Sequence, residues 1–534
     1  MDKKILKSLI FVLLYFIFFN TNVKAGTLYN DGNKDTKETS TFFGGTIQRK
    51  DVESIEFKNT KEVPSGVIGS WDASVEKDGS IMTWYTDTNN NGLYEVYIGN
   101  DGILELPIDS NRLFKNFINV KTLNISNVRT SKVTDMRGMF YGMKSLTSLD
   151  VSHFDTSNVT DMGSMFTNLE KVTSLDVSHF DTSKVTSMGY MFYGMKSLTS
   201  LNVSHFDTSK VTNMGSMFSN LEKVTSLDVS HFDTSKVTNM PWMFFGMKSL
   251  TSLDVSHFDT SNVTDIGAMF QNLESLTSLD VSHFDTSKVT SMGYMFYGMK
   301  SLASLNVSHF DTSNVTNMGS MFYGMKSLTS LDVSHFDTSN VTYMGSMFYG
   351  MKSLASLNVS HFDTSNVTDM GHMFYGMESL TSLDVSNFDT SKVTNMVGMF
   401  SGNDKLKNVL IKNSNIVGND NFAGSISNKT LVLSPNIDSL KIKGIKDKDN
   451  NAKTGRVISG DKIGDNTILI FADSNEDGKV NSADLLKVKL HILNKKELIG
   501  FEFKSSDVDF NDNVNANDLL ILRNHLIGTK KLFN

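Results

Sequence analysis

Two segments near the C-terminus carry oxygen-bearing side chains at one fixed spacing. Residues 473–484 place Asp or Asn at positions 1, 3, 5, 9 and 12, and residues 507–518 repeat that spacing 34 residues later. Ca²⁺ takes six to eight oxygen ligands, and such a loop adds a backbone carbonyl at position 7. The pattern therefore predicts two calcium ions. The ligands expected for the first are Asp473, Asn475, Asp477, Lys479 through its carbonyl, Asn481 and Asp484, and those for the second are Asp507, Asp509, Asn511, Asn513 through its carbonyl, Asn515 and Asp518.

An apolar-rich stretch follows each loop at once and predicts a short helix. The helices are expected at residues 485–493 and 519–527, which gives the loop-and-helix arrangement of an EF-hand. The first loop has Gly478 at position 6, whereas the second has Asp512 there. Asp adopts the left-handed backbone conformation less readily than Gly. We therefore expect the second site to bind calcium more weakly than the first.

The N-terminus has the features of a secretory signal peptide. Lysines at positions 3, 4 and 7 precede an unbroken apolar run over residues 9–19 and small residues up to Ala25. A membrane-spanning helix needs about 20 apolar residues, so a cleaved signal is favoured over a transmembrane anchor. The sequence therefore predicts a secreted protein that is extracellular or associated with a cell surface.

Composition narrows the possible chemistry. The chain of 534 residues has no cysteine, which excludes disulfides, zinc ribbons and a cysteine nucleophile. The formal net charge is −8 and the basic residues are scattered, whereas a nucleic-acid-binding protein gathers them on one face. We therefore expect no nucleic-acid partner.

Most of the chain is an internal repeat. A Met-Phe pair returns every 26 residues, from Met139-Phe140 to Met399-Phe400, with no insertion. A fixed period in this range indicates that each unit stacks only on its neighbours. At about 4.8 Å per coil, the roughly eleven coils would form an array about 50 Å long.

The pattern inside one unit predicts a strand and a helical turn. Leu146, Leu149 and Val151 have a Leu-x-x-Leu-x-Leu spacing that suits a half-buried strand. The apolar positions of residues 159–166 suit a short helical turn, with Thr160 as its N-cap. Two residues after the Met-Phe pair, each unit has only Gly or Asn, which tolerate the left-handed conformation that ends a helix. We therefore expect a repeat solenoid with one parallel strand and one short helical turn per coil.

Identical coils stack identical residues into columns. A histidine column runs from His153 to His361, and we expect no metal there because each next histidine is one coil away. A second column should face outward from the strand, either as a solvated face or as a surface that binds ligands. It is the first candidate for a ligand face, and its members are Asp150, Asp176, Asn202, Asp228, Asp254, Asp280, Asn306, Asp332, Asn358 and Asp384.

The residues outside the repeats predict caps. Residues 70–72, 82–85 and 93–98 have the character of short strands. Residues 87–92 predict a hairpin turn and not a calcium loop, because Ile98 would stand at the twelfth position. The expected organisation is a signal peptide at residues 1–25, an N-terminal β-rich cap at 26–119, a solenoid at 120–405, a C-terminal cap and linker at 406–465, and a small α-helical calcium module at 466–534.

Residues 120–405 resemble the repeats of BspA-like leucine-rich-repeat surface proteins. The resemblance rests on the unit at residues 146–166, Leu-Thr-Ser-Leu-Asp-Val-Ser-His-Phe-Asp-Thr-Ser-Asn-Val-Thr-Asp-Met-Gly-Ser-Met-Phe. It implies a leucine-rich-repeat-like solenoid on a bacterial surface, with adhesion to proteins of a host or a neighbouring cell. For this chain we expect the solenoid to bind a protein or glycan ligand whose identity the sequence does not give. The family often has Cys where this chain has Met143, Leu169 or Met195, so its thiol chemistry is missing here.

Residues 466–534 resemble a type I dockerin, on the strength of two tandem loops that both end in Asp at position 12. The resemblance implies a calcium-dependent module that binds a cohesin domain of a partner protein. The cohesin contacts implied by position are Ser482, Ala483, Lys489 and Leu490 in the first segment, and Ala516, Asn517, Arg523 and Asn524 in the second.

No catalytic constellation stands out from the repeat, so we expect a binding protein and not an enzyme. Two alternatives stay open. Many dockerin-bearing chains are glycoside hydrolases of extracellular polysaccharide-degrading complexes, but the acidic pair that they need would have to lie within residues 26–120, which is a small space for such a domain. The other alternative is a passive spacer with no ligand.

Overall fold

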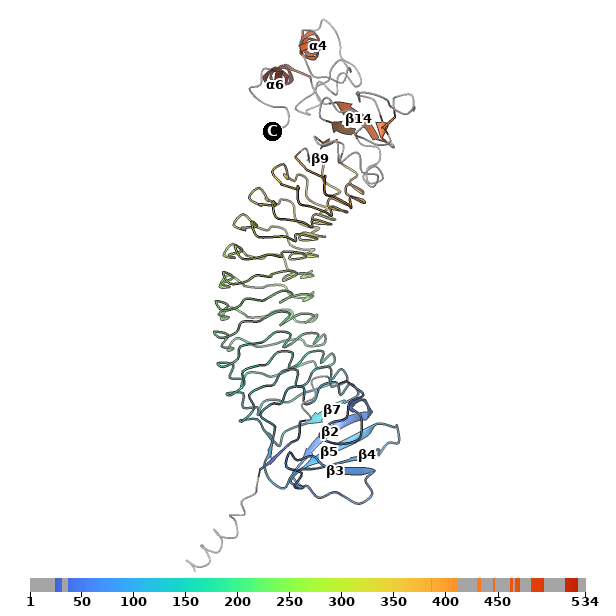
Figure 1. Ribbon diagram of the computed structural model, residues 1–534, viewed down its shortest axis with the longest axis vertical. Helices are drawn as coiled ribbons and strands as arrows, with labels where there is room; N and C mark the ends of the chain where they lie inside the picture. Colours follow the sequence, from blue (N-terminus) through green and yellow to red (C-terminus); the bar gives the residue numbers. More distant parts are fainter. Residues whose placement is uncertain are drawn as a thin grey trace, which may run out of the picture. The chain divides into compact units, whose positions relative to one another are not determined.

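The structure is a computed structural model (Figure 1). It describes residues 25–30, 37–385, 387–406, 408–411, 430–433, 445–446, 462–463, 466–470, 482–493 and 514–526. The predicted signal peptide lies almost wholly outside these residues. By its contacts the chain divides into two compact units, one of residues 1–237 with 243–253 and the other of residues 238–242 with 254–534. Among the described residues, no helix combines the length and apolar character needed to cross a membrane.

The N-terminal part of the first unit is a five-stranded sheet with the strand order β3-β4-β5-β2-β7. The strands are β2 (Val52–Lys58), β3 (Gly69–Asp72), β4 (Met82–Thr86), β5 (Tyr94–Gly99) and β7 (Thr122–Asn124). The three predicted strands are therefore confirmed as β3, β4 and β5. The predicted hairpin turn is also confirmed, because antiparallel β4 and β5 flank it and the Asp87 carboxylate accepts the backbone N–H groups of Asn91 and Gly92.

This sheet covers the first coil of the repeats. Strand β2 pairs in parallel with β7, which belongs to that coil, and a smaller sheet joins β1 (Gly26–Thr27), β6 (Leu104–Glu105) and β8 (Val128–Arg129). Beside a short 3-10 helix, η1 (Arg49–Asp51), the fully buried Arg49 guanidinium donates to the carbonyls of Leu113 and Lys115, 3.0 Å away in each case. Because the turn segments of the coils donate their N–H groups to the following coil, carbonyls at this end have no preceding coil to bond them, and Arg49 satisfies two.

Within each of the two compact units, the coils share one apolar core. In the coil that begins at Leu146, the side chains of Leu146, Val151, Met162 and Phe166 are at most 1% exposed. Phenylalanines of neighbouring coils stack directly: the ring centroids of Phe140 and Phe166 are 5.9 Å apart, and the rings are inclined by 5°. The recurring Leu, Val, Met and Phe positions therefore form the core of the repeats.

The predicted helical turn is wrong: within the described coils no helix forms. The segment is a run of tight turns, in which Met165 donates to the Met162 carbonyl while the intervening Ser164 N–H donates to Gly189 of the next coil. Ser164 has a positive φ of 58°, which stops a right-handed helix from continuing. Thr160 is likewise no N-cap, because no helix follows it and its hydroxyl donates to the Thr134 carbonyl of the preceding coil.

The predicted Gly/Asn column does adopt the left-handed conformation, with φ of 59° at Asn168 and 73° at Gly246. These residues end turns and not helices. The predicted strand of each coil forms as a regular strand only at the two ends of the repeat array, as β7 and as β9 (Ser382–Asp384). Between them, most of the isolated parallel bridges lie elsewhere in the coil, as in the series that links Asp135, Asp161 and Ser187. One bridge, between Ser226 and Ser252, lies in the expected strand segment. The protein is thus built from repeats with parallel pairing between coils.

In the second unit, β9 is the first strand of a six-stranded sheet. Its strands after β10 no longer follow the 26-residue period. Strands β9, β10 (Asn408–Ile411), β11 (Thr430–Leu433) and β14 (Asn466–Ile470) pair in parallel, and β13 (Lys462–Ile463) and β12 (Ile445–Lys446) add antiparallel pairs. Buried Asn403 ties the last Met-Phe coil to the one before it, because its amide accepts the N–H of Met377 and donates to the carbonyl of Phe374.

The C-terminal segment contains two helices of equal length, α4 (Ser482–Ile492) and α6 (Ala516–Leu526). Their bounds differ by the same 34 residues that separate the two predicted calcium loops. Both predicted helices are confirmed, although each begins three residues earlier than expected. The helices contact one another, and Val488 and Leu522 at equivalent positions are fully buried.

Candidate functional site

The predicted calcium ligands are only partly within the described residues. Asp484 and Asp518, the twelfth positions of the two loops, lie in the first turns of α4 and α6 with no exposed surface. One Asp518 oxygen accepts the backbone N–H of Asn515 at 2.8 Å. A carboxylate removed from water needs strong partners, and a bidentate acid at position 12 is the ligand that a calcium loop requires. The two buried acids therefore fit calcium. Outside the described residues lie Asp473, Asn475, Asp477, Lys479, Asn481, Asp507, Asp509, Asn511 and Asn513.

The residues expected to contact a cohesin lie on the two helices. Most of their side chains are exposed, namely Ser482, Ala483, Lys489, Ala516, Asn517 and Arg523. Leu490 is half-buried, and the side chain of Asn524 is outside the described residues. Exposure at matching positions of α4 and α6 leaves these side chains available to a partner.

The column proposed as a ligand face lies at the surface, except that Asp384 is half-buried. Its side chains have a local structural role. Asp150 accepts the N–H of Ser152 at 3.0 Å and its hydroxyl at 2.7 Å, and these hydrogen bonds lower the pKa of Asp150. The equivalent bond recurs at Asp254 with Ser256 and at Asn202 with Ser204. One oxygen of each side chain is thus already occupied in closing a turn.

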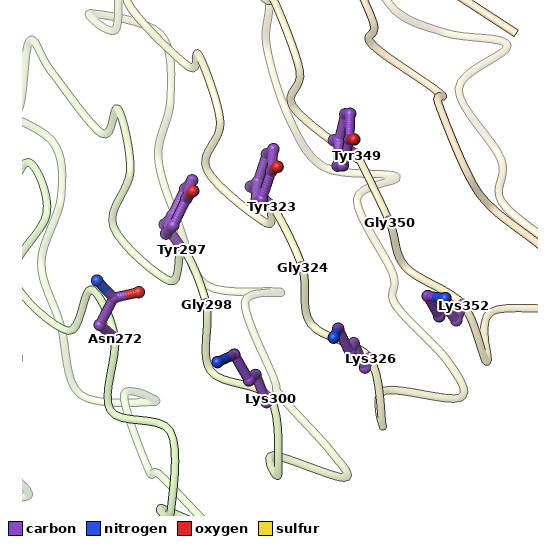
Figure 2. A pocket seen from close by; sticks show the side chains of 10 residues that line it. All are labelled: Asn272, Tyr297, Gly298, Lys300, Tyr323, Gly324, Lys326, Tyr349, Gly350 and Lys352. Carbon is purple, nitrogen blue, oxygen red and sulfur yellow. The ribbon is translucent and has the colours of Figure 1, made fainter. Parts of the chain in front are cut away.

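A cavity of about 420 Å³ lies in the second unit, at residues that the sequence interpretation did not single out (Figure 2). Figure 2 shows a row of tyrosines, a row of lysines and glycine backbone between them. We name it the tyrosine–lysine groove, and its lining residues are Asn272, Tyr297, Gly298, Lys300, Tyr323, Gly324, Lys326, Tyr349, Gly350 and Lys352.

One wall of the groove is a stack of aromatic rings. The ring centroids of Tyr297 and Tyr323 are 4.3 Å apart, as are those of Tyr323 and Tyr349, and Tyr375 continues the stack at 4.6 Å. The rings are inclined by 10° or less. Because their faces cover one another, the tyrosines present mainly edges and hydroxyls. Burial, together with the neighbouring tyrosines, raises the pKa of Tyr323, so its hydroxyl stays protonated.

The floor is open because glycine follows glycine along this part of the column. In earlier coils Gly alternates with Asn, and a Cβ built on Gly194 would meet the amide of Asn168 from the preceding coil. Asn272 covers Gly298 in the same way. A Cβ built on Gly324, in contrast, would have the Gly298 Cα as its nearest neighbour, 4.0 Å away. The groove therefore begins where the alternation ends.

The charge pattern changes at the same place. In earlier coils lysine alternates with glutamate, and the pairs are joined, as Lys196 is to Glu170 at 3.5 Å. The groove has three lysines in succession: Lys300 pairs with Glu274 at 2.7 Å, and Lys352 pairs with Glu378. Lys326 lies between them, and no ion pair joins it to any acid in the described part of the chain. The order of coil types in the sequence contains this signal, because Tyr-Gly-Met-Lys stands in three consecutive units only here.

Comparison with protein families identifies the repeats. The model described as "Mycoplasma protein of unknown function, DUF285" matches residues 108–226, 197–302, 219–331, 269–357 and 350–439. Together these segments span more than half of the chain, and the protein therefore belongs to that family. Residues 463–527 match the model of the dockerin type I domain.

No curated protein is significantly similar to the chain. Among solved structures, the functional domain of InlJ from Listeria monocytogenes, which includes a cysteine ladder, is 17% identical, with a TM-score of 0.26 and coverage of 64% of this chain and 76% of that one. The Toll–Spatzle complex of Drosophila is 13% identical, with a TM-score of 0.22 and coverage of 62% of this chain and 53% of that one. At these TM-scores neither structure informs the fold or function of this chain.

Proposed function

We propose that the protein is a secreted binding protein that attaches to a cohesin-bearing partner through its C-terminal module. The match of residues 463–527 to the dockerin type I domain carries this proposal. The duplicated helices support it, since each buries an acid, Asp484 or Asp518, at the place where a calcium loop ends. The module would hold two calcium ions, one per loop, with the helices packed against each other through Val488 and Leu522.

Capture on immobilised cohesins tests the attachment. The purified full-length chain is expected to bind at least one type I cohesin in calcium and to be released by a chelator, because binding of the ions is expected to be coupled to folding of the module. The variant Lys489→Glu with Arg523→Glu, which reverses an exposed charge on each helix, should weaken capture without changing calcium uptake. Capture that is equally strong in excess chelator would reject the proposal.

The repeats would serve as a leucine-rich-repeat-like solenoid with an adhesin-like role. Support comes from their exposed columns of polar side chains and from their stacking on a continuous apolar core, which leaves long surfaces for a ligand. An array of glycans and matrix proteins, probed with the full-length chain, tests this role. A passive spacer would bind none of them.

We also propose that the chain is not an enzyme. The tyrosine–lysine groove is lined by Tyr, Gly, Lys and Asn, whereas glycoside hydrolysis uses a pair of carboxyl groups. A screen for sugar release from plant and bacterial polysaccharides should therefore give no product. Release that persists through purification would favour an enzyme component of a polysaccharide-degrading complex.

A further inference from the structure

We propose that the tyrosine–lysine groove binds an anionic carbohydrate chain lying across successive coils. The proposal rests on the extracellular binding role proposed above and gives that role a ligand class. Three features of the groove support it: a row of hydroxyls, a row of ammonium groups, and a floor without side chains.

The hydroxyl row suits a ligand rich in hydroxyl groups. Tyr297, Tyr323 and Tyr349 are each half-buried and stacked, so their orientation is fixed before a ligand arrives. A phenol both donates and accepts hydrogen bonds, which matches sugar hydroxyls. At one end, the exposed ring of Tyr294 lies 5.8 Å from that of Tyr297 and offers an aromatic face against which the C–H face of a sugar can pack.

The lysine row requires negative charge in the ligand. Lys300, Lys326 and Lys352 are exposed and recur at one-coil spacing, about 5 Å. Like charges at this separation repel one another. Glu274 and Glu378 relieve the repulsion for the outer two, and the central Lys326 has no such acid among the described residues. A carboxylate or sulfate beside Lys326 would supply the missing partner.

The glycine floor favours a flat ligand over a peptide. The N–H of Gly298 donates to the carbonyl of Tyr323, and that of Gly324 donates to the carbonyl of Tyr349, so these floor donors are already bonded between coils. A peptide strand would therefore find those donors taken. A chain of sugar rings needs only room, hydroxyl partners and cations, which the groove supplies.

Affinity electrophoresis and calorimetry with the full-length protein in calcium test the proposal, with polygalacturonate and dextran sulfate as anionic probes and dextran as the neutral control. We expect one or both anionic probes to bind, more weakly as salt rises, and dextran to bind at least tenfold more weakly. Lys326→Gln should weaken binding about tenfold, since it removes a charge-assisted hydrogen bond. Lys248→Gln is the matched control, because Lys248 pairs with Glu222 in a coil of the first unit.

Two substitutions alter the floor while keeping residue types that the column already uses. Gly324→Asn should fold, because Asn272 adopts a φ of 60° at the equivalent position and a Cβ has room at Gly324, and it should cover the floor and reduce binding. Asn272→Gly uncovers Gly298 and should keep or strengthen binding.

Three results would overturn the proposal: no binding of either anionic probe, unchanged binding by Lys326→Gln, or equally tight binding of poly-glutamate, which would indicate a peptide site. Cohesin capture measured on the same preparations separates the two proposals. If the protein is captured by cohesin but binds no glycan, only the proposal for the groove is refuted. If it binds glycan but is not captured, only the proposed attachment to cohesin is refuted.

Discussion

The side-chain amide of Asn272 lies over the backbone of Gly298 in the next coil. That single contact marks the end of the tyrosine–lysine groove, because the following glycines have no amide above them. Local surface properties in this array therefore depend on which residue the preceding coil carries, and not only on the coil's own sequence.

Replacing Gly246 with Val should destabilise the repeats by about 1 to 2 kcal/mol. Gly246 has a φ of 73°, a conformation that β-branched residues rarely adopt, and a Cβ there would also meet the amide of Asn220. Chemical unfolding monitored by circular dichroism measures the change. Gly246→Asn is the control: its Cβ would meet the Asn220 amide in the same way, but Asn adopts the left-handed conformation more readily than Val, so it should lose less. An unfolding curve identical to the native one would contradict the steric argument.

Removing calcium should unfold the C-terminal module and leave the repeats intact. Without cations, the clustered acids of each loop repel one another, and so small a module has little core to oppose them. Hydrogen exchange on the full-length chain should show loss of protection in α4 and α6 only. Asp473→Ala with Asp484→Ala should weaken the first site and Asp507→Ala the second, measured by calcium titration. Protection that is unchanged in excess chelator would show that the module folds without the ion.

Acid should destabilise the repeats through their turn-closing aspartates. The hydroxyl and N–H of Ser256 lower the pKa of Asp254, and Ser282 does the same for Asp280. A pKa that is lower in the folded than in the unfolded state contributes stability above the unfolded value, near 4, and that contribution is lost as pH falls through the folded value. The melting temperature should therefore fall as pH decreases below about 4.

Asparagine tests this interpretation, since Asn202 already closes the same turn in another coil. The double variant Asp254→Asn with Asp280→Asn keeps the acceptor and loses the titration. Its melting temperature should fall less steeply with acid than that of the native chain. Equal slopes would place the acid sensitivity in other groups.

Replacing Arg49 with Met should loosen the first coil. The buried guanidinium donates to the carbonyls of Leu113 and Lys115, and an unsatisfied buried acceptor costs about 1 to 3 kcal/mol. We expect a loss of about 2 to 4 kcal/mol and faster hydrogen exchange in the first coils. Lys50→Met, the same kind of change one residue away, should have a small effect. If both variants exchange alike, Arg49 does not cap the array.

Features that depend on one coil alone could be predicted from the sequence. The period, the apolar core around Phe166 and the left-handed Gly246 follow from side-chain types that recur at fixed positions. The absence of the predicted helical turn could not be foreseen in this way. Its apolar spacing fits a helix, but Ser164 takes a positive φ and its N–H finds its acceptor at Gly189. That competing bond exists only after the coils stack, so a local pattern cannot contain it.

The same distinction, between features of one short segment and features that need several stacked coils, applies to the candidate sites. The helices after the predicted calcium loops were predictable because a loop-and-helix pattern is encoded in one short segment, and the helices that start at Ser482 and Ala516 agree with it. The two calcium sites stay predictions. The groove was missed because its walls come from three coils, and each wall appears in the sequence as single residues 26 apart. The 26-residue period places Tyr297, Tyr323 and Tyr349 in one column of neighbouring coils.

The uniform bonding between coils also has a consequence for the number of coils that the chain can contain. Within each unit, an interior coil presents equivalent donors and acceptors to both neighbours, and the special contacts of Arg49 and Asn403 are confined to the ends. Whole 26-residue coils can therefore be inserted or deleted without disturbing either end contact. Duplicating the coil that contains Tyr323 would lengthen the groove by one lysine and one tyrosine. The length of the groove therefore depends on the number of such coils in the chain.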